Sequence, residues 1–364
     1  MIQNAIASLF YTHSNPTSTF AHMSLSLNAG QVAKAKQLIS EAKSIVITTH
    51  KSPDGDAIGS SLALYLVLKS MGKKTTVIVP DDIPEYLQWM KGCDEIVVHF
   101  HHKEKAEAIV ADADLIFMLD HNHLSRTGDM ENGLRNAKAD FILVDHHQQP
   151  EQFAKVIYSD TASCSTCEML YKFIVWLGEK ERIDPYTGEC LYCGIMTDSG
   201  SFRFPAVTAE THLIAANLIE RGVDHAQIHR EIFDTNPKDR LKLMGYALNE
   251  KLEVMEDCAT AIISLTQDEL KRFNYRPGDT EGLANQALSV KGIKLAAFFR
   301  EGNNEIKISF RSKSSFDVNQ LAREGWKGGG HVNAAGGSST DTLENTLNTF
   351  RQQARSLSSS IINS

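Results

Sequence analysis

Residues 44–68 have the sequence SIVITTHKSPDGDAIGSSLALYLVL. The part that ends at His50 is apolar and rich in β-branched residues, which predicts a buried strand. From Asp56 onward the segment predicts a helix that stops near Gly72. A strand, a short polar turn and a helix form the repeating unit of a parallel α/β sheet. This stretch therefore indicates an α/β fold.

The same alternation continues along the chain. We predict further strands at 74–80, 94–100, 114–120 and 140–145, then helices at 164–178, 186–197, 208–221 and 224–249, and strands again at 259–265, 293–300 and 304–311. This order predicts an N-terminal doubly wound parallel-sheet domain, a linker helix and a smaller C-terminal α/β domain with a mixed sheet. The predicted boundaries are 24–224, 225–250 and 251–364.

Composition limits the classes of function. The chain has 364 residues, 42% hydrophobic and 23% charged, as expected for a globular protein of two domains. It has no apolar run of 18 residues, residues 1–22 are polar without a basic start, and six cysteines in so long a chain do not form a disulfide framework, so we predict a cytoplasmic protein. Met23 is an alternative start, which leaves the status of residues 1–22 open. The net charge of −8 argues against long duplex nucleic acid or a membrane as a partner.

Potential metal ligands follow the first predicted strand. His50, Asp54 and Asp56 lie within seven residues, in a turn that contains Pro53 and Gly55. Proline restricts the backbone before it, and glycine permits a tight turn that can aim both carboxylates at one point. A solvated turn in which Asp56 caps the following helix is an equally good interpretation of this segment alone.

Three other segments end in the same chemistry. Asp120 closes an apolar strand, Asp145-His146-His147 closes another, and Asp198 follows an apolar helix beside a glycine turn. In α/β sheets, ligands bind outside the carboxyl ends of the strands. Together these segments predict one site of carboxylates and imidazoles, and a metal-dependent hydrolase.

These motifs resemble the DHH phosphoesterase superfamily, which is named for the triplet at 145–147. The resemblance covers residues from about 30 to 340 and implies a two-metal site. One Mn²⁺ would be held by His50, Asp54 and Asp120, and the other by Asp56, Asp120, His146 and Asp198, so that Asp120 bridges. Mg²⁺ and Co²⁺ are alternatives. The four carboxylates would balance two divalent charges, and a water between the ions would attack phosphorus. The resemblance further implies that His147 contacts the phosphoryl group and that Asp145 supports the site from behind.

A second motif lies near the C-terminus, as Gly328-Gly329-Gly330-His331-Val-Asn333-Ala-Ala-Gly336-Gly337. Successive glycines let backbone N–H groups point into a hollow that binds anions, and His331 adds a donor that can carry positive charge. A flexible loop is the alternative. The segment resembles the glycine–histidine motif of the DHH-associated C-terminal domain, which implies contacts to the nucleotide. Arg311 and Arg203 are candidate phosphate partners, because a guanidinium can grip phosphate with two hydrogen bonds.

Among members of this superfamily, the compact two-domain architecture resembles the oligoribonuclease (nanoRNase)/pAp phosphatases. The resemblance implies hydrolysis of RNA of two to a few nucleotides and of 3′-phosphoadenosine 5′-phosphate (pAp). Two alternatives stay open: a soluble cyclic di-AMP or pApA phosphodiesterase, and a non-catalytic nucleotide-binding sensor. The expected oligomeric state is a monomer or homodimer.

Overall fold

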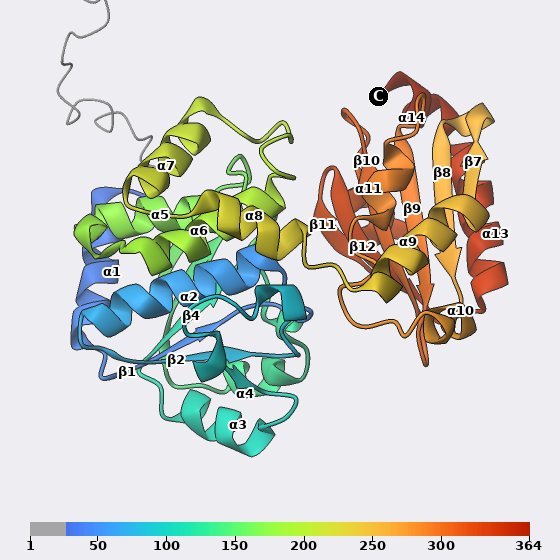
Figure 1. Ribbon diagram of the computed structural model, residues 1–364. Helices are drawn as coiled ribbons and strands as arrows, with labels where there is room; N and C mark the ends of the chain where they lie inside the picture. Colours follow the sequence, from blue (N-terminus) through green and yellow to red (C-terminus); the bar gives the residue numbers. More distant parts are fainter. Residues whose placement is uncertain (1–26) are drawn as a thin grey trace, which may run out of the picture.

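The first domain is built on a parallel sheet (Figure 1). The computed structural model describes residues 27–364, so the question about residues 1–22 lies outside the described part. Six strands lie in the order β3-β2-β1-β4-β5-β6, and all neighbours are parallel. The strands are β1 (Ser44–Thr48), β2 (Lys74–Val79), β3 (Val97–Val98), β4 (Leu115–Leu119), β5 (Asp140–Asp145) and β6 (Val156–Ser159). The prediction of a doubly wound parallel sheet is confirmed.

Two strands at the edges of this sheet differ from the sequence prediction. β3 has two residues instead of the predicted 94–100, because Cys93–Glu95 forms a short 3₁₀ helix. β6 was not predicted, since its four residues alternate between buried and half-buried positions and give only a weak pattern. Edge strands pair on one side only, which permits such short segments.

Helices cover both faces of the sheet. One face packs against α1 (Ala29–Glu41), α2 (Gly55–Ser70) and α5 (Thr166–Trp176), and α6 (Pro185–Asp198), α7 (Ala209–Glu220) and α8 (His225–Phe233) form an outer layer beyond them. The other packs against α3 (Lys103–Ala111), the 3₁₀ segment η3 (Leu124–Met130) and α4 (Glu131–Arg135). Helix α2 is buried along nearly its whole length, which explains its uniformly apolar sequence.

The strand order places a topological switch point between β1 and β4. The chain leaves β1 toward β2 and β3 on one side, then returns to β4 and continues outward through β5 and β6. Neighbouring connections therefore diverge at the carboxyl ends of β1 and β4, which leaves a crevice for ligands. His50, Asp120 and the 145–147 triplet follow β1, β4 and β5 and so meet at this crevice.

The second domain has a mixed sheet, as predicted, in the order β11-β12-β10-β9-β8-β7. Only β8 and β9 are parallel neighbours. The strands are β7 (Leu252–Met255), β8 (Thr260–Leu265), β9 (Leu295–Glu301), β10 (Ile306–Ser312), β11 (Gly329–His331) and β12 (Ala334–Ser339). One face packs on α9 (Lys238–Glu250), α10 (Gln267–Arg272) and α11 (Leu283–Leu288), and the other on α12 (Val318–Gly325), α13 (Leu343–Ser356) and α14 (Ser358–Asn363).

The glycine-rich segment folds as a β-hairpin rather than as a loop. β11 and β12 pair antiparallel, with Gly329 opposite Gly336 and His331 opposite Ala334. The hairpin adds an edge to the second sheet, because β12 also pairs with β10. The motif therefore has a rigid backbone that fixes the direction of His331.

The predicted linker helix at 225–250 consists of two helices. α8 contributes Ile228 and Ile232 to the core of the first domain, whereas α9 contributes Leu243 and Ala247 to the second. Pro237 occupies the N-cap position of α9. A proline at this position cannot continue α8 as one long helix. The crossing between the domains is thus the short segment 234–237 (Figure 1). Within residues 27–364, no helix is long and apolar enough to cross a membrane.

Candidate metal centre

The first group of predicted ligands lies at the start of α2. His50 presents Nε2 to Asp120 Oδ2 at 3.3 Å and to Asp54 Oδ2 at 4.0 Å, while its Nδ1 lies 2.9 Å from the Lys51 carbonyl oxygen. Asp54 is the N-cap of α2, and its Oδ1 accepts from the N–H groups of Asp56 and Ala57. The helix is therefore capped by Asp54 and not by Asp56, and Asp54 Oδ2 is directed at His50.

The second group gathers around His146. Its Nε2 lies 3.4 Å from Asp198 Oδ2, 3.9 Å from Asp56 Oδ2 and 3.5 Å from Asp120 Oδ1. Its Nδ1 faces the Ser163 carbonyl oxygen at 3.2 Å. Asp120 thus directs one carboxylate oxygen at each imidazole, which places it between the two groups.

Asp120 has an unusual backbone. Its φ of 61° lies in the left-handed region, which side chains other than glycine seldom occupy. Its N–H is fixed by the Val144 carbonyl oxygen at 3.2 Å, beside the end of β5. Such strain at the end of a strand is typical of functional positions.

The donor set fits divalent metal ions. His50, Asp54 and Asp120 have ligand atoms within 4.8 Å of one another, and so do Asp56, His146 and Asp198. Within residues 27–364, no lysine or arginine forms an ion pair with these four carboxylates. Carboxylate and imidazole donors suit Mn²⁺ or Mg²⁺. An aspartate shared between two such groups is compatible with two neighbouring ions.

The ionisation of these groups also points to competition between protons and metal. Burial, together with Asp120 and Asp198, raises the pKa of Asp56, and burial raises the pKa of Asp198 to about 7. Burial opposes charge on Asp120 and on His146, but their mutual hydrogen bond lowers the pKa of Asp120 and raises that of His146. These raised pKa values favour protonation of Asp56, His146 and Asp198 in the absence of metal.

We expect metal affinity to rise with pH. Ions bind the deprotonated ligands, so protons on Asp198 and His146 must leave on binding. Mn²⁺ should bind at least about tenfold more tightly at pH 8 than at pH 6. Calorimetric titration in two buffers of different ionisation enthalpy measures the released protons. An affinity and heat that depend on neither pH nor buffer would contradict this ligand set.

The N-terminus of α5 supports the cluster from behind. The N–H groups of Thr166 and Cys167 donate to Asp56 Oδ2 and Oδ1 at 2.6 and 2.8 Å, and the Thr166 hydroxyl donates to Asp120 Oδ1 at 3.0 Å. A helix N-terminus favours a carboxylate. This role was not predicted from the sequence, although the N-cap Ser165, followed three residues later by Glu168, is a recognisable helix start.

We expect Thr166→Val to weaken Mn²⁺ binding about tenfold without unfolding the domain, because only the hydroxyl donor to Asp120 is lost. Mn²⁺ titration with thermal melting measures both effects. Thr187→Val is the matched control, since Thr187 is buried in the first turn of α6 and hydrogen-bonds none of the predicted ligands. Equal affinities in the two variants would exclude a supporting role for Thr166.

The second histidine of the triplet is held by the aspartate of the same triplet. Asp145 Oδ1 accepts from His147 Nδ1 at 2.7 Å, and Asp145 Oδ2 accepts from the His147 backbone N–H at 3.0 Å. Both carboxylate oxygens are therefore used in fixing His147. Asp145 also lies within the group formed with Asp120 and His147.

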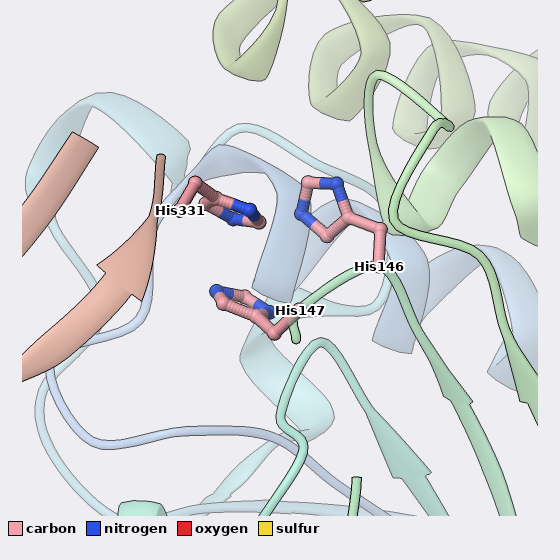
Figure 2. Close-up of side chains that lie close together, drawn as sticks. All are labelled: His146, His147 and His331. Carbon is pink, nitrogen blue, oxygen red and sulfur yellow. The ribbon is translucent and has the colours of Figure 1, made fainter. Parts of the chain in front are cut away.

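His331 from the second domain completes the site (Figure 2). Its ring stacks on His147 with centroids 4.2 Å apart and lies 4.5 Å from the ring of His146. Burial lowers the pKa of His331 and of His147 well below the usual range. Burial therefore favours the neutral form of both rings.

The two candidate arginines differ in position. Arg311 is the penultimate residue of β10 and donates to the neighbouring Phe310 carbonyl oxygen, and its charge acts on Asp198. Arg203 is exposed, donates to the Gly200 carbonyl oxygen at 2.6 Å and lies over the Phe204 ring. The structure thus brings Arg311 toward the cluster and directs Arg203 to its own turn. The role of each in substrate binding stays a prediction.

The glycine hairpin leaves no room for side chains at two positions. A Cβ at Gly328 would lie 1.9 Å from the Gly336 carbonyl oxygen, and one at Gly330 would lie 2.4 Å from that of Ala334. At Gly329 the nearest atom is Asn319 Oδ1, at 3.4 Å. Asn333 donates to the Ser312 hydroxyl and to the Ser314 carbonyl oxygen. Asn333 therefore ties the hairpin turn to the segment after β10.

We expect Gly328→Ala to destabilise the second domain by about 1–3 kcal/mol and to raise KM, because the strands must separate to accept the methyl group. Gly329→Ala in the same hairpin is the control and should change stability by less than about 0.5 kcal/mol. Urea unfolding and steady-state kinetics compare the two variants. Indistinguishable variants would show that close strand contact is unimportant.

Arg126 was not predicted as a site residue. It lies in η3, and its carbonyl oxygen accepts from the Lys51 N–H at 2.7 Å, next to His50. In the described part of the chain its guanidinium has neither a hydrogen bond nor an ion pair, and its charge contributes to the lowered pKa of His147, after burial. An unpaired cation beside the histidines can attract an anion. Its only sequence signal is its position six residues after Asp120.

Comparison with known proteins agrees with this geometry. Residues 44–195 match the model of the DHH family, N-terminal domain, and residues 259–359 match that of the DHHA1 domain. A Streptococcus mutans protein named as a probable bifunctional oligoribonuclease and PAP phosphatase is 29% identical over 83% of this chain and 91% of that protein. A Thermus thermophilus protein named as a bifunctional oligoribonuclease and PAP phosphatase is 30% identical over 80% of this chain and 83% of that protein.

A solved structure is also similar over nearly the full length. An exopolyphosphatase-related protein from Bacteroides fragilis superposes with a TM-score of 0.88 at 36% identity, covering 93% of this chain and 99% of that one. The likeness spans both domains of this chain, and the two family models match in the same order along it. The chain belongs to the DHH family of phosphoesterases, with an N-terminal DHH domain and a C-terminal DHHA1 domain.

Proposed function

We propose that this protein is a two-metal phosphoesterase that hydrolyses short oligoribonucleotides, of two to a few nucleotides, and pAp. The observation that carries the proposal is the position of Asp120 between two His/Asp groups. The ring of His146, in one of these groups, lies 4.5 Å from that of His331 in the glycine hairpin. Phosphoester hydrolysis needs charge neutralisation and an activated water. A pair of divalent ions, with Mn²⁺ as our first choice, supplies both when bound.

The residues of the chain then have separate tasks. His50, Asp54, Asp56, Asp120, His146 and Asp198 hold the ions. Asp145 fixes the His147 ring, so that its Nε2 is directed away from Asp145 and is free to contact a phosphoryl oxygen. Arg311 and Arg126 supply positive charge from different domains. The backbone of the glycine hairpin and His331 meet the nucleotide from the second domain.

Short substrates fit the molecule better than long ones. Few phosphate contacts suffice for a dinucleotide or a bisphosphate, so the net charge of −8 is tolerated. The two relatives named above carry the same pair of activities in their names.

A cyclic dinucleotide substrate is the second candidate. A Bacillus subtilis protein named as the cyclic-di-AMP phosphodiesterase GdpP is 26% identical over 82% of this chain, which spans 45% of that protein. The same site would cleave cyclic di-AMP or pApA by the same chemistry. A sensor without activity is the third candidate, and the intact set of six predicted ligands argues against it.

One side-by-side assay separates these candidates. Hydrolysis of pAp, a diribonucleotide, a longer RNA and cyclic di-AMP is followed with Mn²⁺ and again with EDTA. We expect metal-dependent turnover of pAp and the dinucleotide, with slower attack on the other two. Dominant cyclic di-AMP cleavage would favour the second candidate. Binding without turnover would favour the sensor, and turnover in EDTA would exclude a metal mechanism.

A further inference from the structure

The buried side chain of Asn319, in the first turn of α12, connects the two halves of the site. Its Nδ2 donates to Gln148 Oε1 of the first domain at 3.0 Å. Its Oδ1 accepts from the Gly330 N–H at 2.9 Å and from Arg323 Nε at 3.1 Å. Because the Gly330 N–H and Arg323 Nε are both donors, the atom that faces them must be the amide oxygen, which fixes the orientation of the Asn319 amide. Only 3% of Asn319 is exposed, so water cannot readily replace these bonds.

Asn319 connects Gln148 with Gly330, and each of these two residues is the sequence neighbour of one of the stacked histidines. Gln148 directly follows His147, and Gly330 directly precedes His331. The rings of these two histidines lie 4.2 Å apart and 30° from parallel. The hydrogen-bonded chain from Gln148 through Asn319 to Gly330 therefore runs beside the contact between His147 and His331.

The partner loop in the first domain is itself fixed. Buried Asn122 donates to the Gln148 carbonyl oxygen at 2.6 Å, and the Asn122 carbonyl oxygen accepts from the Glu151 N–H at 2.8 Å. Gln149 has a φ of 58°, and its side chain accepts from Arg323 of α12. The backbone on each side of the contact is thus held within its own domain, and the Gln148–Asn319 bond joins two rigid parts.

We propose that Asn319 and Gln148 form an interdomain clasp that positions His331 against His147 for nucleotide binding. The inference rests on the proposed function. Asn319 is a positioning residue, since it acts through Gly330 and Gln148 and not on the substrate. The clasp holds the second domain against the metal centre before substrate arrives, so that less binding energy is spent on closing the domains.

The bond from Arg323 to Gln149 lies beside the clasp, whereas two further contacts between the domains lie away from it. The Tyr86 hydroxyl donates to Glu281 Oε2 at 2.5 Å, and Arg276 pairs with Glu85 at 2.8 Å. The latter pair is exposed, and such pairs contribute little. Neither contact adjoins a residue of the DHH triplet or of the glycine hairpin.

Kinetics with matched variants tests the clasp. Gln148→Ala and Asn319→Ala should each raise KM for pAp about tenfold at saturating Mn²⁺ and change kcat by less than about twofold, because bound substrate itself bridges the domains. The double variant should be no worse than Asn319→Ala, since the two single changes remove the same bond between Gln148 and Asn319. Asn319→Asp should retain near-normal KM, because it still accepts from Gly330 and the Gln148 amide can rotate to donate to it.

Gln320→Ala is the control on the same helix, since Gln320 is exposed and its side chain hydrogen-bonds Glu324 of that helix. It should leave KM unchanged. An unchanged KM in Gln148→Ala would overturn the proposal, and so would additive effects in the double variant. Both results would mean that Asn319 merely stabilises the hairpin.

A second measurement needs no substrate and separates this inference from the proposed function. Small-angle X-ray scattering of the substrate-free protein should give a larger radius of gyration for Gln148→Ala and Asn319→Ala than for wild type and Gln320→Ala. Expansion without pAp or RNA hydrolysis in wild type would keep the clasp and reject the substrate assignment. Unchanged dimensions in both variants would reject the clasp whatever the substrate is.

Discussion

Asp120→Ala is expected to reduce kcat/KM for pAp by at least about 10⁴-fold, because one side chain is lost from both metal groups at once. The fold should survive, since β4 and its neighbours keep their apolar contacts. The measurement is turnover at saturating Mn²⁺, with circular dichroism and calorimetric metal titration. The number of ions bound should fall below two.

Asp120→Asn refines this test. Asparagine tolerates the left-handed backbone at this position, so the change isolates the charge of the carboxylate from its shape. Asp129→Ala, an exposed aspartate in the adjoining η3 segment, is the control and should retain full activity. An Asp120→Ala variant with near-normal turnover would show that Asp120 does not bridge.

Glu168→Ala is expected to lower the free energy of unfolding by about 3–5 kcal/mol, because it leaves a buried ammonium group without one of its partners. Glu168 is 2% exposed and Lys172 is 7% exposed. Glu168 accepts from Lys172 Nζ at 2.7 Å, from the Thr211 hydroxyl at 2.8 Å and from Cys164 Sγ at 3.0 Å. Glu210 remains beside Lys172 but is less buried.

Equilibrium unfolding in urea, with metal removed, measures this effect. Asp268→Ala is the control, since Asp268 pairs with Lys271 on the surface and such pairs contribute less than about 1 kcal/mol. Similar losses in the two variants would mean that the buried pair is no more important than a surface pair.

Much of the fold follows from local sequence. β1, β4 and β5 were predictable because a central parallel strand is buried on both faces and is apolar throughout. The six predicted ligands were found because each one stands at or next to an element end, where strand order alone brings distant segments together. The structure places them in two adjoining groups. Their coordination roles stay predictions.

Other features have no local signal. The hairpin of β11 and β12 is made of glycine and alanine, whose strand propensity is low, and it forms because β10 offers an edge. Gln148 and Asn319 are 171 residues apart, so their bond depends on how the two domains pack. Glu168 and Lys172 look like an ordinary surface pair on a helix, and only the burial of α5 reveals their importance.

The segment 234–237 separates the predicted metal centre from the second domain, which carries the glycine hairpin. Every predicted metal ligand precedes it, whereas His331, Arg311 and the hairpin follow it on a separate hydrophobic core. Sequence divergence after this segment can alter which phosphoester is selected while the hydrolytic apparatus stays intact. Under the proposed function, such a division would allow proteins that share these two domains to differ in substrate, and the matched relatives bear names for oligoribonucleotides, pAp and cyclic di-AMP.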